Sequence, residues 1–182
     1  MKLHLGCGKR QLAGYVHVDL ADFPHIDLRT SVDNLEFFKS ETVEEIYSSH
    51  TFEYFDRMEA PKVLGEWHRV LKPEGRLYVT VPDFDSLIKV YQESNSLNKI
   101  IGPLFGRWII GENLNPIFHK TVWNEIELST VLEGCGFKSV ERFDPVEYLS
   151  AIDSNYDDQS LAFFPHMNRK GIQVSLALCA VK

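Results

Sequence analysis

The sequence predicts a doubly wound α/β domain, in which helices cover both faces of a mostly parallel sheet. Short apolar segments alternate with segments of helical periodicity along the chain, and such alternation is typical of this class. Residues 172–181 are apolar on both alternating faces except at Gln173 and Ser175, as expected for a strand buried between two helical layers. Ligands of such sheets bind beyond the carboxyl ends of the strands. We therefore expect the functional residues to follow the strands.

Each predicted strand is a short apolar or β-branched run that ends at turn residues. The fifth of these runs is bounded by the turn Lys72-Pro73-Glu74-Gly75 and by Pro82. The predicted strands before the last one span residues 2–5, 15–20, 26–28, 45–49, 76–81 and 138–143.

Two helices are predicted from the spacing of apolar residues, and a third from a capping residue. The first lies between the fourth and fifth strands, where one apolar stripe recurs at the helical period. The second spans residues 123–133 and ends at Gly134 and Gly136. The third begins near Phe84, where Asp83 suits the N-cap position. The stripe of the first helix consists of Val63, Leu64, Trp67, Val70 and Leu71.

The chain of 182 residues is comfortable for one domain and short for two, so residues 1–182 are expected to form a single domain. Residues 94–118 contain several glycines and prolines and fit neither the strand period nor the helix period. We interpret this segment as an inserted, partly helical lid over the substrate side. Residues 144–169 form a second irregular stretch.

The composition of the chain disfavours several classes of function. The chain has 19 basic and 26 acidic residues and a net charge of −7, which disfavours a nucleic-acid partner because phosphate contacts dominate such binding. Its three cysteines are far apart, and no cysteine or histidine spacing suggests a metal site. The start of the chain lacks a signal-like segment, and no apolar run approaches the roughly 20 residues that span a bilayer. We expect a cytoplasmic protein that binds no metal ion.

The loop Gly6-Cys7-Gly8 follows the first strand, and Asp19 ends the second. Glycines allow a sharp turn and the close approach of a ligand, and a carboxylate at the end of the neighbouring strand can accept hydrogen bonds from both hydroxyls of a ribose. Two departures argue against a dinucleotide. Position 11 is Gln11 instead of a third glycine, and the acid comes eleven residues after Gly8 instead of about 20. S-adenosylmethionine contains no pyrophosphate and suits this shorter loop.

Further segments follow in a recognisable order. The chain opens with Leu3-His4-Leu5-Gly6-Cys7-Gly8 and continues with His17-Val18-Asp19-Leu20, and related segments occur at residues 45–55, 71–76, 81–83, 132–137 and 175–182. This order resembles class I S-adenosylmethionine-dependent methyltransferases, in particular small proteins of the methyltransferase type 11 group. The resemblance covers nearly the whole chain. One departure is Tyr54, which replaces the second histidine of a His-x-x-Glu-His segment in that family.

The resemblance implies a Rossmann-like, seven-stranded sheet whose last strand runs antiparallel, with S-adenosylmethionine over the first, second and fourth strands. It implies that the glycine loop cradles the amino-acid end and ribose of the cofactor, and that Asp19 binds the ribose hydroxyls. Residues between the third and fourth strands would meet the adenine, and residues after the fourth strand would lie near the methionine portion. The implied cofactor-binding residues are Leu5, Gly6, Cys7, Gly8, Asp19, Ser31, Val32, Asp33, Ser49 and His50.

Methyl transfer needs a base only when the nucleophile must lose a proton. The catalytic candidates are His50, Asp83 and His119, and each has a structural alternative: orienting a loop, capping a helix and lying exposed in a loop, respectively. Glu53 is expected to be structural, bonding to the backbone near the glycine loop. Four aromatic residues either wall a substrate pocket or belong to the core. They are Tyr91, Trp108, Phe118 and Trp123.

The leading hypothesis is an S-adenosylmethionine-dependent methyltransferase that acts on a small-molecule or glycan acceptor. The alternative is a cofactor-binding regulatory or scaffold protein, which would bind the cofactor without methyl transfer. A nicotinamide-dependent oxidoreductase is disfavoured by Gln11 and by the short spacing between Gly8 and Asp19. The oligomeric state is left open, with a homodimer among the options.

Overall fold

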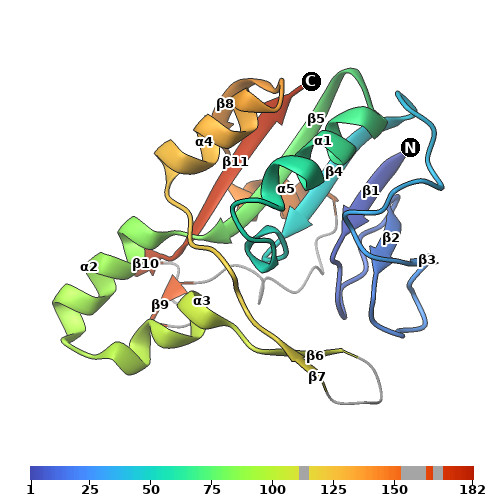
Figure 1. Cartoon of the computed structure of the whole chain (residues 1–182). Coiled ribbons are helices and arrows are strands. Elements are labelled where there is room, and N and C mark those ends of the chain that lie inside the picture. The colour runs from blue at the N-terminus through green and yellow to red at the C-terminus, as the bar shows by residue number, and fades with distance from the viewer. Residues whose placement is uncertain (111–114, 153–162, 166–169) are drawn as a thin grey trace.

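The computed structural model describes residues 1–110, 115–152, 163–165 and 170–182, and these residues build one seven-stranded sheet (Figure 1). The strand order is β3-β2-β1-β4-β5-β11-β8. Neighbouring strands from β3 to β5 are parallel, whereas β11 is antiparallel to both β5 and β8. The predicted doubly wound fold with an antiparallel last strand is therefore confirmed. The strands are β1 (Lys2–Leu5), β2 (Val16–Asp19), β3 (Leu28–Arg29), β4 (Val43–Ser49), β5 (Leu71–Pro82), β8 (Lys138–Arg142) and β11 (Ser175–Val181).

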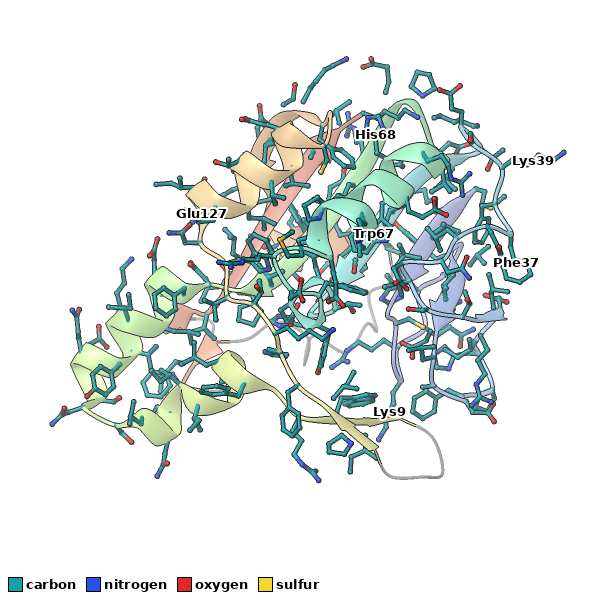
Figure 2. The ribbon with its side chains drawn as sticks, in the orientation of Figure 1. Lys9, Phe37, Lys39, Trp67, His68 and Glu127 are labelled. Atoms are coloured by element: carbon teal, nitrogen blue, oxygen red, sulfur yellow. The ribbon has the colours of Figure 1, made fainter. Side chains whose placement is uncertain are left out.

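Helices cover both faces of the sheet because successive side chains of a strand point to opposite faces. On β4, Ile46 belongs to the apolar cluster that contains α1 (Ala60–Val70) and α4 (Glu125–Gly134), and Tyr47 belongs to the cluster that contains α5 (Pro145–Ile152). Trp67 of α1 is fully buried, and its Nε1 donates to the carbonyl oxygen of Val32 at 2.8 Å. Figure 2 shows Trp67 between α1 and the sheet, whereas Lys39 extends outward.

Most predicted elements occur with shifted ends. The third strand lies at Leu28–Arg29 instead of 26–28, and β5 continues through the expected turn at 72–75, since Leu71 already pairs with Val43 of β4. The expected last strand at 172–181 is divided. β11 begins at Ser175, while β10 (Ile172–Gln173) pairs with β9 (Phe163–Phe164) in a separate ribbon.

One helix occurs where irregular chain was expected. α5 occupies the beginning of the stretch 144–169, and its start is fixed by Asp144, whose Oδ1 accepts hydrogen bonds from the amides of Val146 and Glu147 at 2.8 and 3.3 Å. A proline at the first helical position is compatible with such a cap. The local sequence thus contained the signal for this helix.

The segment interpreted as a lid follows α2 (Phe84–Ser94) and is more ordered than expected. It contains a short 3-10 helix η2 (Leu97–Lys99), helix α3 (Ile101–Phe105) and an antiparallel hairpin of β6 (Trp108–Ile110) and β7 (Asn115–Ile117). Figure 1 shows the hairpin beyond the carboxyl ends of the central strands. Residues 111–114 of this segment lie outside the described residues. Among the helices that the structure describes, none has the length and apolar character needed to cross a bilayer.

His4 is a buried titratable residue in the middle of the fold. It lies on β1 with 1% of its surface exposed, and its ring is surrounded by those of Tyr15, His17 and Tyr47, with centroids 5.2–6.5 Å away. Burial, with smaller contributions from the neighbouring His17, Arg10 and His25, lowers the pKa of His4 from 6.5 to about 3. The folded protein therefore holds His4 neutral over most of the acidic range.

This neutral histidine makes the fold sensitive to mild acid. Between about pH 7.5 and pH 5 the unfolded chain takes up a proton at His4 and the folded chain does not, so the free energy of unfolding should fall, by about 2 kcal/mol from this group. The variant His4→Phe keeps a ring at this position and should lose that component of the pH dependence. Urea denaturation of both proteins at the two pH values measures it. An equal loss of stability in the variant would contradict the assignment to His4.

Candidate active site

The loop after β1 has a backbone that favours glycine at two positions. Gly6 and Gly8 have φ angles of +67° and +54°, in the left-handed region. At Gly6 there is also a close approach, because a Cβ atom would lie 2.1 Å from Oγ1 of Thr51. A Cβ atom at Gly8 would meet no atom within 4 Å. The loop therefore packs tightly against the chain that follows β4 at Gly6 and is open at Gly8.

Asp19 at the end of β2 holds this loop in place. Its Oδ2 accepts a hydrogen bond from the amide of Gly8 at 2.8 Å, and its Oδ1 accepts one from the amide of Ala21 at 2.7 Å. The residue is 9% exposed. Each oxygen of a carboxylate can accept more than one hydrogen bond, so Asp19 can bind the loop and still accept hydrogen bonds from a ligand.

A cavity of about 350 Å³ lies beside the glycine loop and Asp19. Its volume falls within the range of small-molecule sites, roughly 300–1,000 Å³. Its walls come from the ends of β1, β2 and β4 on one side and from the hairpin on the other. The lining residues are Gly6, Cys7, Gly8, Arg10, Asp19, Leu20, Ser31, Val32, Ser49, His50, Thr51, Tyr54, Phe55, Trp108, Ile117 and His119.

Most of the site residues expected from the sequence meet in this cavity. Three do not line it: Leu5 is fully buried in the core, Asp33 is exposed beside it, and Asp83 caps α2. The carboxylate of Asp83 accepts hydrogen bonds from the amide of Asp85 at 3.2 Å and from Oγ of Ser86 at 2.8 Å. The expected residues that line the cavity are Gly6, Cys7, Gly8, Asp19, Ser31, Val32, Ser49, His50 and His119.

The cavity also contains residues that sequence analysis missed. Leu20 directly follows Asp19 and Arg10 lies two residues after Gly8, so their nearness in the sequence to expected cofactor-binding residues could have identified them. Phe55 and Ile117 had no comparable signal, because their place in the cavity depends on tertiary packing. Of the four aromatic residues weighed as pocket walls, Trp108 lines the cavity, whereas Tyr91 and Phe118 are partly exposed elsewhere and Trp123 stacks on Phe52 in the core.

Two histidines and a glutamate lie close together at one end of the fourth strand. The 3-10 helix η1 (Phe52–Tyr54) carries Glu53, which is fully buried. Its Oε1 lies 3.5 Å from Nδ1 of His50 and 3.6 Å from Nε2 of His119. Contrary to expectation, neither carboxylate oxygen of Glu53 hydrogen-bonds to the backbone in the described part of the chain. The two histidines line the cavity, and Glu53 lies behind them.

His119 is attached to the lid segment. Its amide donates to the carbonyl oxygen of Phe105 at 2.8 Å, and its Nδ1 lies 2.9 Å from the carbonyl oxygen of Pro103. A carbonyl oxygen can only accept, so Nδ1 carries a hydrogen and Nε2 faces Glu53. Gly106 leaves room for the ring, since a Cβ atom there would lie 2.2 Å from Nε2 of His119. The ring of Tyr54 packs edge-on against His119 at 4.8 Å.

Two further ionisable groups of the cavity, the Cys7 thiol and the Tyr54 phenol, stay neutral near pH 7. Burial, together with the nearby Asp19 carboxylate, raises the pKa of the Cys7 thiol to about 12. Burial and the charge of Glu53 raise the pKa of Tyr54 to about 12. A thiolate nucleophile at Cys7 is therefore disfavoured, and Tyr54 keeps its phenolic proton.

Comparison with known proteins gives a consistent picture. A family model described as a methyltransferase domain matches residues 21–79, about a third of the chain. A search of the curated proteins found no match. A SAM-dependent methyltransferase from Archaeoglobus fulgidus has a similar structure, with a TM-score of 0.57, 16% identity, and coverage of 100% of this chain and 85% of that one.

Two more solved structures share the fold with a TM-score of 0.57. One, from Thermotoga maritima, is described as a possible histamine N-methyltransferase, with 18% identity and coverage of 100% of this chain and 81% of that one. The other is 1,6-didemethyltoxoflavin-N1-methyltransferase from Burkholderia thailandensis, with bound 1,6-didemethyltoxoflavin and S-adenosylhomocysteine, 13% identity, and coverage of 100% and 70%. The resemblance seen in the sequence is confirmed, and the findings support a methyltransferase enzyme with S-adenosylmethionine as its cofactor.

The two glycines of the loop should differ in their tolerance of a side chain. Gly6→Ala and Gly8→Ala both place a Cβ atom on a left-handed backbone, which costs roughly 1–2 kcal/mol of stability in each variant. Only in Gly6→Ala does the new Cβ atom also clash with the side chain of Thr51. We expect Gly6→Ala to lower the free energy of unfolding by at least about 1 kcal/mol more than Gly8→Ala, measured by urea denaturation. Adding Thr51→Gly should recover part of the difference. Equal losses in the two single variants would show that the contact at Gly6 is not tight.

Proposed function

We propose that this chain transfers a methyl group from S-adenosylmethionine to a small-molecule or glycan acceptor. The observation that supports this most strongly is the carboxylate of Asp19, which is bonded to the amide of Gly8 and lines the same cavity as the glycine loop. A loop that a ligand can approach closely and an acid one strand away suit an adenosyl ligand without phosphates. The net charge of −7 favours a small acceptor over nucleic acid.

The cavity residues divide into groups that match the parts of this cofactor. Asp19 would accept hydrogen bonds from the ribose hydroxyls, and Ser31 and Val32 would lie at the adenine. The glycine loop and Ser49 would hold the amino-acid end. Arg10 supplies a guanidinium at the cavity whose Nε has no hydrogen-bond partner among the described residues, and we assign it to the carboxylate of that end. When bound, the cofactor supplies a methyl group on a positively charged sulfur, which an acceptor attacks directly.

The rest of the cavity would hold the acceptor. Tyr54, Phe55, Trp108 and Ile117 give it a largely apolar wall, and His50 and His119 are the groups there that can take a proton. The structure from Burkholderia thailandensis holds a small acceptor together with S-adenosylhomocysteine, which supports an acceptor of that size here. The three cysteines are free thiols, in keeping with the cytoplasmic location that we propose.

Removal of the Asp19 carboxylate tests the cofactor assignment. Asp19→Ala should weaken binding of S-adenosylhomocysteine by at least roughly 100-fold, because two hydrogen bonds to a charged group, each worth about 1.5–3 kcal/mol, are lost. Asp22→Ala is the matched control, since Asp22 is largely exposed and pairs only with Arg29 among the described residues. Isothermal titration calorimetry measures both. Unchanged affinity in Asp19→Ala, or binding of NAD in place of S-adenosylhomocysteine by the wild type, would reject the proposal.

We further propose that residues 94–118 act as a lid that determines acceptor specificity. Trp108 and Ile117 of the hairpin line the cavity, and α3 holds His119 through two hydrogen bonds. Closure of such a segment over a bound cofactor excludes water from the methyl group.

The lid should open more readily than the sheet. Hydrogen exchange at the amides of α3, β6 and β7 should be fast in the free protein and slow at least about tenfold with S-adenosylhomocysteine. Amides of β4 and β5 serve as the internal control and should stay slow throughout. Slow exchange of the lid in the free protein, unchanged by the ligand, would show that it is a rigid part of the core or of a subunit interface.

A further inference from the structure

The hydroxyl groups that line the cavity after β4 are not equally available to a ligand. The hydroxyl of Thr51 is shared between the carbonyl oxygens of Gly6 and Ser49. A hydroxyl has one hydrogen, so the hydrogen of Thr51 is used inside the protein. Ser49, the last residue of β4, also lines the cavity, and its Oγ lies 2.7 Å from Oγ1 of Thr80 on β5. This pair of hydroxyls determines what Ser49 offers to a ligand.

Thr80 is held in the middle of the sheet by the strands on both sides. It pairs with Ser49 of β4 and with Ala177 of β11 in the register of the sheet. Its carbonyl oxygen accepts a hydrogen bond from the amide of His50 at 2.9 Å. Thr80 does not line the cavity, and only 1% of its surface is exposed. Its side chain therefore acts on a ligand only through Ser49.

The burial of Thr80 decides the direction of the hydrogen bond between the two hydroxyls. In the described part of the chain, Ser49 is the partner of the Thr80 hydroxyl. If Ser49 donated, the hydrogen of Thr80 would be buried without an acceptor, and this costs free energy. Thr80 is therefore the donor. The hydrogen of Ser49, which is half-buried at the cavity, is left for a ligand or for water.

We propose that Thr80 is a positioning residue, which directs the hydroxyl hydrogen of Ser49 toward the carboxylate of the bound cofactor. The inference rests on the methyl transfer proposed above. At the amino-acid end of S-adenosylmethionine the ammonium group is a donor, so the carboxylate is the group that accepts from Ser49. Arg10 is assigned to the same carboxylate, whose two oxygens can accept hydrogen bonds from both residues.

Ser49 needs this support because a serine side chain is otherwise free to turn. Its Oγ can occupy three staggered positions about the Cα–Cβ bond. The hydrogen bond from Thr80 selects one of them before the cofactor arrives, so binding does not have to fix it. Ser48 provides a contrast on the same strand. Its side chain points to the opposite face, is fully buried and has no hydrogen-bond partner for its hydroxyl among the described residues.

The first experiment is a double-mutant cycle on the binding of S-adenosylhomocysteine, measured by isothermal titration calorimetry. Thr80→Val keeps the shape of the side chain but not its hydroxyl, and it should weaken binding roughly three- to tenfold. Thr80→Ser keeps the hydroxyl and should bind like the wild type. Ser49→Ala should weaken binding by at least about tenfold, and adding Thr80→Val to it should have no further effect.

Ser48→Ala is the matched control, because it removes a buried hydroxyl from the opposite face of the same strand. It should bind S-adenosylhomocysteine like the wild type. Thr80→Ala, which also lacks the hydroxyl, replaces Thr80→Val should that variant fail to fold. Wild-type affinity in the variant without the Thr80 hydroxyl, or an equal loss of affinity when Ser49 is already alanine, would overturn the positioning role.

The second experiment uses decarboxylated S-adenosylhomocysteine, which keeps the adenosine, the sulfur and the amine. Thr80→Val and Ser49→Ala should leave its affinity within about twofold of the wild-type value, because the group that Ser49 binds is missing. A loss as large as that for S-adenosylhomocysteine would overturn the assignment to the carboxylate. Wild-type protein that binds no S-adenosylhomocysteine would overturn the proposed function itself, whereas normal wild-type binding with an unaffected Thr80→Val overturns only the role of Thr80.

Discussion

The side chain of Thr51 lies directly against the backbone of Gly6, and the arrangement of the whole cavity depends on this contact. Oγ1 of Thr51 lies 3.3 Å from the carbonyl oxygen of Gly6 and 3.2 Å from that of Ser49, so its hydroxyl is shared between two long hydrogen bonds. The contact joins the chain after β1 to the chain after β4. The loop that Asp19 holds and the turn that carries Glu53 thereby share one wall, so the two halves of the proposed site are fixed relative to each other.

Most strands and helices of the sheet could be predicted from the sequence because the patterns that indicate them are local. Buried parallel strands are short apolar runs, and the glycine loop with Asp19 follows from the first two of them. The strands of the hairpin have three residues each, too few for a period to be visible. Helix α5 was missed although Asp144 caps it, since the residues after it lack a continuous pattern. Here the turn chemistry was a better guide than periodicity.

The candidate site was less predictable because its residues come together only in the folded chain. Glu53 was expected to bond to the backbone, yet its neighbours are His50, close in sequence, and His119, which arrives from beyond the lid. Trp108 and Ile117 reach the cavity only because the hairpin folds over it. Asp83 shows the opposite case: of its two expected roles only the helix cap was local, and the structure places its carboxylate in the cap of α2.

The two hydrogen bonds between His119 and α3 have a consequence for how such a protein can change over time. The wall that would select the acceptor and the imidazole of His119, which can take a proton, are parts of one connected segment. Transplanting this segment from one homologue to another would therefore carry the reaction chemistry along with the substrate preference. An insertion in the chain between β6 and β7 leaves the hydrogen bonds of His119 to Pro103 and Phe105 in place, so it can alter the substrate preference without altering the reaction chemistry. Diversification within this fold should accordingly concentrate between these two strands.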